Sequence, residues 1–224
     1  GTIGHDTILQ SLAIVRGTGS LLFFGGPIVG GGIACLDGAS PTVRNCIIKD
    51  NDAQRGGGVY VGQTNSGAGA RLMRNNIRDN EATQYGGGVY IELVQGDAGP
   101  GAVFSRSRIS DNTAGISGGG LYADNSTNPQ MDHCWFVLNK ATIGSGAGAY
   151  LSSPIDARIK DSMFDRNDCP GYGGGLAIVD GVGVDVEHST FIDNEADLGG
   201  GGIYEYGWDP VGLGPTKIWD DLIV

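Results

Sequence analysis

Two carboxylates recur at equivalent positions of this chain. Glu92 closes the segment that begins at Gly86, and Asp124 closes the matching segment that begins at Gly118. If these segments stack as neighbouring strands, their backbones lie about 4.8 Å apart. Carboxylates that close can hold Ca²⁺ or act as the acid and nucleophile of a glycosidase. The chain is acidic throughout, and no Arg or Lys lies near the pair in the sequence. We therefore expect no catalytic residue and no cofactor. The alternative is that Glu92 and Asp124 act in catalysis or bind Ca²⁺.

Aromatic residues form a second recurring set. If Val59 and Val61 point into a core, strand alternation sends the tyrosine between them to the outer face, and the same holds in the other segments. Such a column is either a cross-strand stack that stabilises a sheet or a flat platform for sugar rings or a protein partner. Ala177 interrupts it, and the last loop adds two residues at its edge. The candidate binding residues are Tyr60, Tyr90, Tyr122, Tyr150, Tyr204, Tyr206 and Trp208.

Other reactive residues lack the partners that their chemistry needs. His5, His133 and His188 have no Ser or Cys at a spacing typical of a nucleophilic triad, and the last two share a position with arginines on a face that we expect to be solvated. The four cysteines show no metal-binding spacing, so they are either buried free thiols or include one disulfide, Cys35 with Cys46.

The elements that must position these residues are repeats. A glycine-led word begins at Gly30, Gly56, Gly86, Gly118, Gly146, Gly173 and Gly200. The first glycines lie 26, 30, 32, 28, 27 and 27 residues apart, a spacing typical of a solenoid. We therefore expect about seven coils of one domain, residues 1–224, cut from a longer chain.

Each coil repeats the same apolar and polar columns. Two apolar positions recur, occupied for example by Ile159 and Phe164, and an asparagine follows the second of them. An asparagine repeated once per coil can occupy a left-handed corner and pass amide hydrogen bonds along the stack. The predicted ladder consists of Asn51, Asn80, Asn112, Asn139, Asn167 and Asn194.

The period is too short for helical hairpins, and β-branched residues between glycines favour strands. We predict an all-β, right-handed parallel β-helix with three short strands per coil, the hand following from the preference for right-handed parallel connections. A leucine-rich repeat is the alternative fold, but its L-x-x-L-x-L signature is absent.

The paired words G-G-[GA]-[VIL] and [FI]-x-x-N resemble the repeats of the chlamydial polymorphic membrane proteins. Phe136 to Asn139, Phe164 to Asn167 and Phe191 to Asn194 match F-x-x-N, although a third glycine replaces the usual alanine. Similar coils occur in large secreted bacterial proteins of pectate-lyase-like shape. The resemblance implies a secreted or cell-surface passenger, often adhesive, and supplies no catalytic residues.

Charge and composition limit the partners. The formal net charge is −11 with only 14 Lys and Arg, so we expect no nucleic-acid partner and no direct membrane insertion. The terminal segments follow the coil pattern without a polar cap, which predicts end-to-end stacking on other copies or flanking coils. An apolar insertion between Gly17 and Gly30 is either a flap over the first coils or a docking patch.

Together these features predict a non-catalytic, extracellular or cell-surface structural or adhesive module, with a tyrosine-lined face for glycan or protein contact. The alternative is a polysaccharide lyase or glycoside hydrolase of pectate-lyase-like fold.

Overall fold

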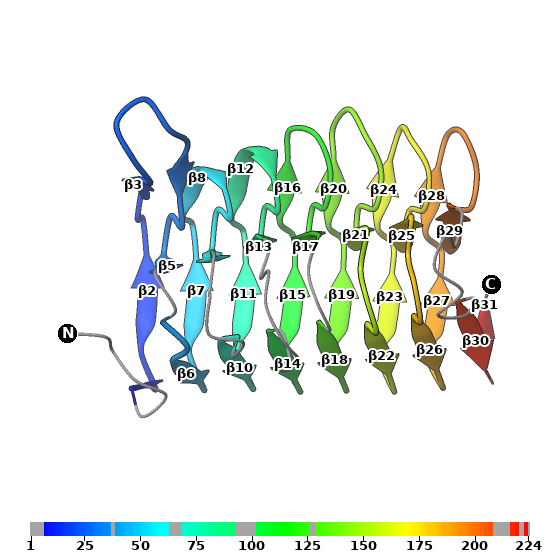
Figure 1. Ribbon diagram of the computed structural model, residues 1–224, viewed down its shortest axis with the longest axis horizontal. Helices are drawn as coiled ribbons and strands as arrows, with labels where there is room; N and C mark the ends of the chain where they lie inside the picture. The colour runs from blue at the N-terminus through cyan, green and yellow to red at the C-terminus, as the bar shows by residue number, and fades with distance from the viewer. Residues whose placement is uncertain are drawn as a thin grey trace.

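The chain folds into a β-solenoid whose coils stack along one axis (Figure 1). The computed structural model describes residues 7–36, 39–62, 69–92, 102–125, 129–207, 216–219 and 222–223. All regular elements within these ranges are β-strands. The described residues accordingly contain no helix with the length and hydropathy of a membrane span.

Four sheets, named A to D here, run along the solenoid, and each full coil visits them in that order. Neighbouring coils pair in parallel in all four sheets. The parallel β-helix is confirmed, but a coil has four strands rather than three. The additional strand is the short one in sheet C, which has only two residues in several coils because it lies between two closely spaced corners.

The strands of sheets A and B carry the two apolar columns. Sheet A contains β1 (Ile8–Gln10), β6 (Thr42–Arg44), β10 (Arg71–Met73), β14 (Val103–Ser105), β18 (Gln130–Asp132), β22 (Arg158–Lys160), β26 (Asp185–Glu187) and β30 (Lys217–Trp219). Sheet B contains β2 (Ala13–Val15), β7 (Ile47–Lys49), β11 (Asn76–Arg78), β15 (Arg108–Ser110), β19 (Trp135–Val137), β23 (Met163–Asp165), β27 (Thr190–Ile192) and β31 (Leu222–Ile223).

The strands of sheets C and D lie on either side of the glycine-rich corner. Sheet C contains β3 (Ser20–Leu21), β4 (Ile28–Val29), β8 (Asp52–Arg55), β12 (Glu81–Tyr85), β16 (Thr113–Ala114), β20 (Lys140–Ala141), β24 (Asp168–Cys169) and β28 (Glu195–Ala196). Sheet D contains the seven glycine-led strands β5 (Ile33–Cys35), β9 (Val59–Val61), β13 (Val89–Glu92), β17 (Leu121–Asp124), β21 (Ala149–Ser152), β25 (Leu176–Val179) and β29 (Ile203–Tyr206).

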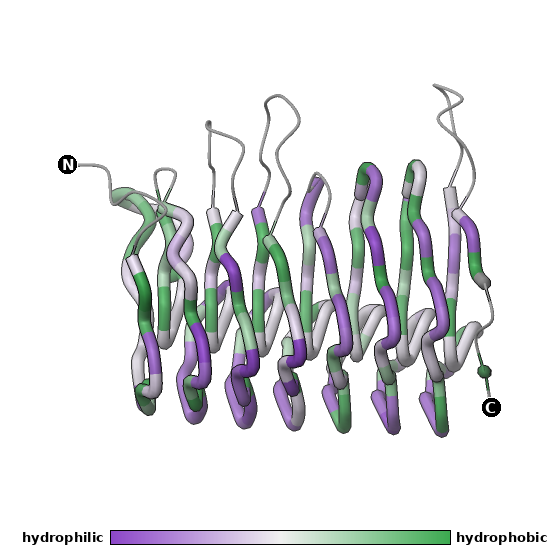
Figure 2. Tube along the Cα trace, turned by 90° about the horizontal axis from the view of Figure 1, so that it is seen from below, coloured by the Kyte–Doolittle hydropathy of each residue, from purple (hydrophilic) through white to green (hydrophobic). Residues whose placement is uncertain are grey.

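The core is a stack of equivalent side chains in register. Leu72 pairs with Val43 on one side and with Phe104 on the other, and all three are buried. Phe164 stacks between Phe136 and Phe191, with ring centroids 4.7 and 4.6 Å apart. Hydrophobic and hydrophilic residues alternate along each coil in Figure 2, as expected for strands with one face in the core.

The asparagine ladder lies at the corner between sheets B and C. The Nδ2 of Asn80 donates to Oδ1 of Asn112 at 2.9 Å and to the carbonyl of Ile48 at 3.0 Å, and its neighbours repeat the pattern. The ladder is confirmed, but its asparagines are not the left-handed residues. The positive φ falls on the preceding residue, such as Asp79 at 54°, which turns the chain so that the asparagine side chain points inward.

A second ladder at the corner between sheets A and B was not predicted. The Asn75 amide donates to the Ser107 hydroxyl, and the Cys134 amide donates to the Ser162 hydroxyl. The column mixes Cys, Asn and Ser, so it has no single-residue signature in the sequence. The left-handed residue again precedes each member of the ladder, for example Arg74 and His133.

Glycine is required at the corner between sheets C and D. Gly86 has a φ of +64°, and a Cβ on Gly88 would lie 2.6 Å from the carbonyl oxygen of Gly120 in the next coil. The coils therefore approach each other too closely for a side chain at this position.

The apolar insertion forms a hairpin in which β3 pairs antiparallel with β4. Leu22 packs against the buried cluster of Val29, Tyr60 and Tyr90, as a flap would, whereas Phe23 and Phe24 are 63% and 102% exposed. The insertion therefore covers the first coils, as the predicted flap does, and the docking patch stays a prediction for its exposed tip.

The cysteines Cys35, Cys46, Cys134 and Cys169 are all buried free thiols, so the disulfide alternative is wrong for this structure. Burial raises the pKa of Cys35 and of Cys134 to about 12. Both thiols therefore behave as small apolar side chains of the core.

Candidate functional site

The tyrosines of sheet D form a continuous stack on the outer side of the sheet. The ring centroids of Tyr60 and Tyr90 are 5.6 Å apart, those of Tyr90 and Tyr122 are 5.4 Å apart, and those of Tyr122 and Tyr150 are 5.0 Å apart. The rings of each pair lie within 6° of parallel. Parallel pairing of β9, β13, β17 and β21 in register produces this column.

The first half of the column is covered. Tyr60 and Tyr90 are 0% and 1% exposed, and Leu22, Leu36 and Tyr85 pack against them. The prediction of a solvent-exposed platform is therefore wrong for Tyr60 and Tyr90. The hairpin insertion and the long strand β12 bring apolar groups over the tyrosines, which periodicity within a single coil does not reveal.

The two candidate carboxylates bind these tyrosines. Glu92 pairs in register with Asp124, as predicted. Glu92 accepts a hydrogen bond from the Tyr60 hydroxyl, Asp124 accepts one from the Tyr90 hydroxyl at 3.1 Å, and Arg55 lies 3.4 Å from Glu92. The carboxylates thus satisfy buried phenols, and Arg55 also lies over the Tyr90 ring at 5.6 Å.

Burial is the main cause of a raised pKa at Tyr60, Tyr90 and Tyr122, and the neighbouring carboxylates raise these pKa values further. All three phenols are therefore neutral at physiological pH, and those of Tyr60 and Tyr90 donate to the two carboxylates. This arrangement supports the stabilising role that the sequence allowed for the stack.

Aromatic side chains near the last strand of sheet D are accessible. Tyr172 and Tyr204 stack with centroids 4.4 Å apart, Tyr172 is 37% exposed, and Tyr206 is 64% exposed. We call Tyr172, Tyr204 and Tyr206 the aromatic patch. Tyr172 was not a candidate, because it lies in the turn before the glycine word rather than in the strand. Trp208 lies outside the described residues.

A shallow groove of about 360 Å³ lies on the outer face of sheet A, a surface that the sequence analysis did not consider. Its lining combines polar and charged residues with Met73 and Val103. Arg158 and Lys160, which belong to it, both approach Glu187, at 3.0 and 3.8 Å. Alternation along the sheet A strands places these side chains on the outer face. The same alternation in the sequence could have predicted this surface.

Among the described residues, the group of three or more metal-ligating side chains that could hold an ion is Asp132, His133 and Asp161. Glu92 and Asp124 belong to no such group within the described ranges. The prediction that His133 lies on a solvated face is confirmed by its 50% exposed side chain. Its proximity to the two aspartates was not predicted from the sequence.

Comparison with known proteins defines the family. The family described as the right-handed β-helix region matches residues 31–213, and the chain belongs to this family. No curated protein matches the sequence. Among solved structures, the chain is similar to QnrB1, a plasmid-mediated fluoroquinolone resistance protein, at 12% identity over 97% of this chain and 91% of that one, with a TM-score of 0.23. A similarity this low carries no inference about function.

Proposed function

We propose that this chain is a non-catalytic structural or adhesive β-helix module that works as a stiff scaffold outside the cell. The observation that carries the proposal is the continuity of its ladders. The hydrogen-bonded asparagines extend from Asn51 to Asn194 without a gap, and each joins two coils. A solenoid whose neighbours are linked at every coil behaves as one rod.

The aromatic patch supports a contact function for that rod. Its stacked, partly exposed rings combine apolar area with phenolic hydroxyls, a combination favoured at glycan and protein interfaces. In this proposal the buried Tyr60 and Tyr90 stabilise sheet D, whereas Tyr172, Tyr204 and Tyr206 form the contact surface.

Glycan-array binding tests the contact function. The double substitution Tyr172→Ala and Tyr206→Ala is expected to abolish binding to any glycan that the parent chain retains, because it removes the accessible rings. The matched control is Trp135→Ala, which removes a 46% exposed ring from sheet B. Equal binding by the parent and the double variant to every ligand found contradicts a role for the patch.

A polysaccharide-active enzyme is the second candidate, and the groove on sheet A favours it. Arg158, Lys160 and Asp132 line the groove together, so cationic and acidic groups are available to one ligand. Incubation with acidic polysaccharides and Ca²⁺ distinguishes the two functions. A scaffold releases no unsaturated or reducing ends, whereas release that is lost in Arg158→Ala establishes the enzyme.

End-to-end stacking of coils stays a prediction. Light scattering over a concentration series tests it, since stacking produces rods that lengthen with concentration and a strictly monomeric species at high concentration contradicts it.

A further inference from the structure

The corner between sheets A and B carries a column of left-handed residues that face solvent. His133 follows β18 with a φ of 52°, Asp161 follows β22 with a φ of 48°, and His188 follows β26 with a φ of 48°. The amide of His133 donates to the carbonyl of Lys160, and the amide of Asp161 donates to that of Glu187, both at 3.0 Å. The backbone therefore holds these side chains one above another in successive coils.

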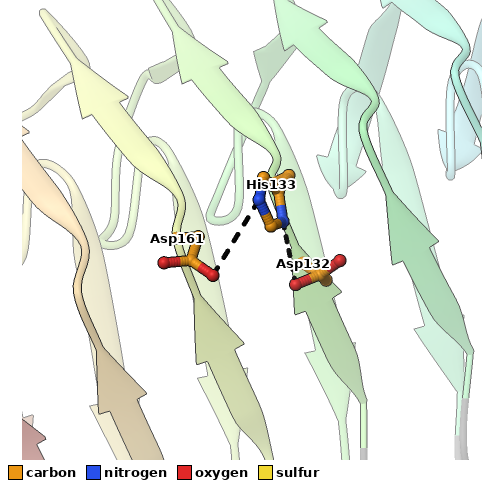
Figure 3. A group of neighbouring side chains, drawn as sticks. All are labelled: Asp132, His133 and Asp161. Atoms are coloured by element: carbon orange, nitrogen blue, oxygen red, sulfur yellow. Dashed lines mark ion pairs between the residues drawn. The ribbon is translucent and has the colours of Figure 1, made fainter.

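Three side chains converge at this corner (Figure 3). The His133 ring lies between the carboxylates of Asp132 and Asp161, with Nδ1 3.0 Å from Asp132 and Nε2 3.9 Å from Asp161. One ligand atom from each of the three residues lies within 4.8 Å of the others. Ligands of a single Zn²⁺ with bonds of about 2.0 to 2.2 Å lie roughly 3 to 4 Å apart, so small rotations of exposed side chains close the site.

Both carboxylates lie beside the His133 imidazole, and Asp132 also shares the sheet A groove with Arg158 and Lys160. Among the described residues, the ion pairs of Asp132 are with His133, and those of Asp161 are with His133 and His188. Lys160 pairs in register with Asp132, but its ammonium approaches Glu187 in the next coil. Arg158 reaches the same glutamate, so both cations are directed along the sheet A face.

We propose that Asp132, His133 and Asp161 bind one divalent transition-metal ion of the Zn²⁺ class and thereby link two adjacent coils. An imidazole with two carboxylates suits Zn²⁺ better than Ca²⁺ or Mg²⁺, which prefer oxygen ligands. Water completes the coordination, because the three side chains are 34 to 50% exposed. His188 lies 3.9 Å from the other oxygen of Asp161 and is outside the three-ligand set.

Titration calorimetry of the full chain, free of any histidine tag, tests the site with ZnCl₂ and, separately, CaCl₂. The substitutions are His133→Asn and Asp161→Asn, since Asn45 occupies the same left-handed corner in another coil and shows that asparagine fits there. The matched control is Arg74→Asn at the same corner, two coils away from His133.

We expect one Zn²⁺ per chain, a higher melting temperature with Zn²⁺, and no comparable effect of Ca²⁺. Each ligand substitution is expected to weaken Zn²⁺ binding by about tenfold or more, whereas the control binds as the parent does. Absence of Zn²⁺ binding, or equal affinity in the parent and His133→Asn, overturns the proposal.

Discussion

Tyrosines on the strands of sheet D serve two purposes because different groups lie over them. Tyr90 is 1% exposed, hydrogen-bonded to Asp124 and stacked on both sides, while Tyr206 is 64% exposed. Each lies on the outward side of a sheet D strand. The effect of truncating a tyrosine is therefore expected to follow the extent of its burial.

Truncation of Tyr90 tests this difference. Tyr90→Ala is expected to lower the free energy of unfolding by about 3 to 5 kcal/mol, because it leaves a cavity between two rings and removes the donor to Asp124. Tyr206→Ala is expected to change it by about 0.5 kcal/mol or less. Urea denaturation of both variants measures the contrast, and equal stabilities contradict the assigned cover.

The thiol of Cys134 provides a second test at this scale. Burial raises its pKa to about 12, so the reactive thiolate is scarce at neutral pH and the core blocks access. Iodoacetamide is expected to leave Cys134 unmodified in the folded protein and to alkylate all four cysteines in denaturant, as measured by mass spectrometry. Rapid alkylation of Cys134 without denaturant is the opposite result.

Stability is organised at the element scale by the corners. The asparagine ladder satisfies buried amides and carbonyls between sheets B and C, and the mixed Asn, Ser and Cys ladder does so between sheets A and B. A buried polar group without a hydrogen-bond partner lowers the free energy of unfolding. Each ladder member bonds to groups in neighbouring coils and therefore stabilises the contact between them.

Removal of one ladder member measures that coupling. Asn112→Ala removes the acceptor of the backbone and side-chain amides of Asn80 and the side-chain donor to the Ile77 carbonyl. The Oδ1 of Asn139 loses one of its two donors and keeps the backbone amide of residue 112. We expect a loss of about 3 kcal/mol or more in the free energy of unfolding, since each buried orphan costs about 1 to 3 kcal/mol. Thr113→Ala, beside it in β16 and only partly buried, is the control, with an expected change of about 0.5 kcal/mol or less. Chemical denaturation compares the two variants, and similar losses show that the ladder adds nothing specific.

At the scale of the whole molecule, three fully or partly buried tyrosines make the stability of the fold decrease at alkaline pH. The folded-state pKa values of Tyr60, Tyr90 and Tyr122 lie above the ordinary value of about 10, chiefly because of burial. The unfolded chain therefore loses these protons first. Their contribution to stability is complete below pH of about 10 and is lost as the pH rises toward the folded-state values.

A tyrosinate absorbance titration with parallel circular dichroism tests this dependence. We expect a first phase from accessible phenols, followed by a cooperative second phase that coincides with loss of β-structure. Replacement of Tyr60 and Tyr90 by Phe should shrink the second phase. Ionisation of all the tyrosines in one phase with unchanged circular dichroism contradicts the burial.

The amino-acid sequence by itself determined the solenoid, its period, its two apolar columns and the asparagine ladder, because each of these repeats once per coil and local spacing encodes it. Only the tertiary structure showed the fourth strand, the left-handed residue before each asparagine, the cover over Tyr60 and Tyr90, and the meeting of His133 with Asp161. These features depend on contacts between coils or on the hairpin insertion. Residues 28 positions apart in the chain, such as His133 and Asp161, become neighbours only when the coils stack in register.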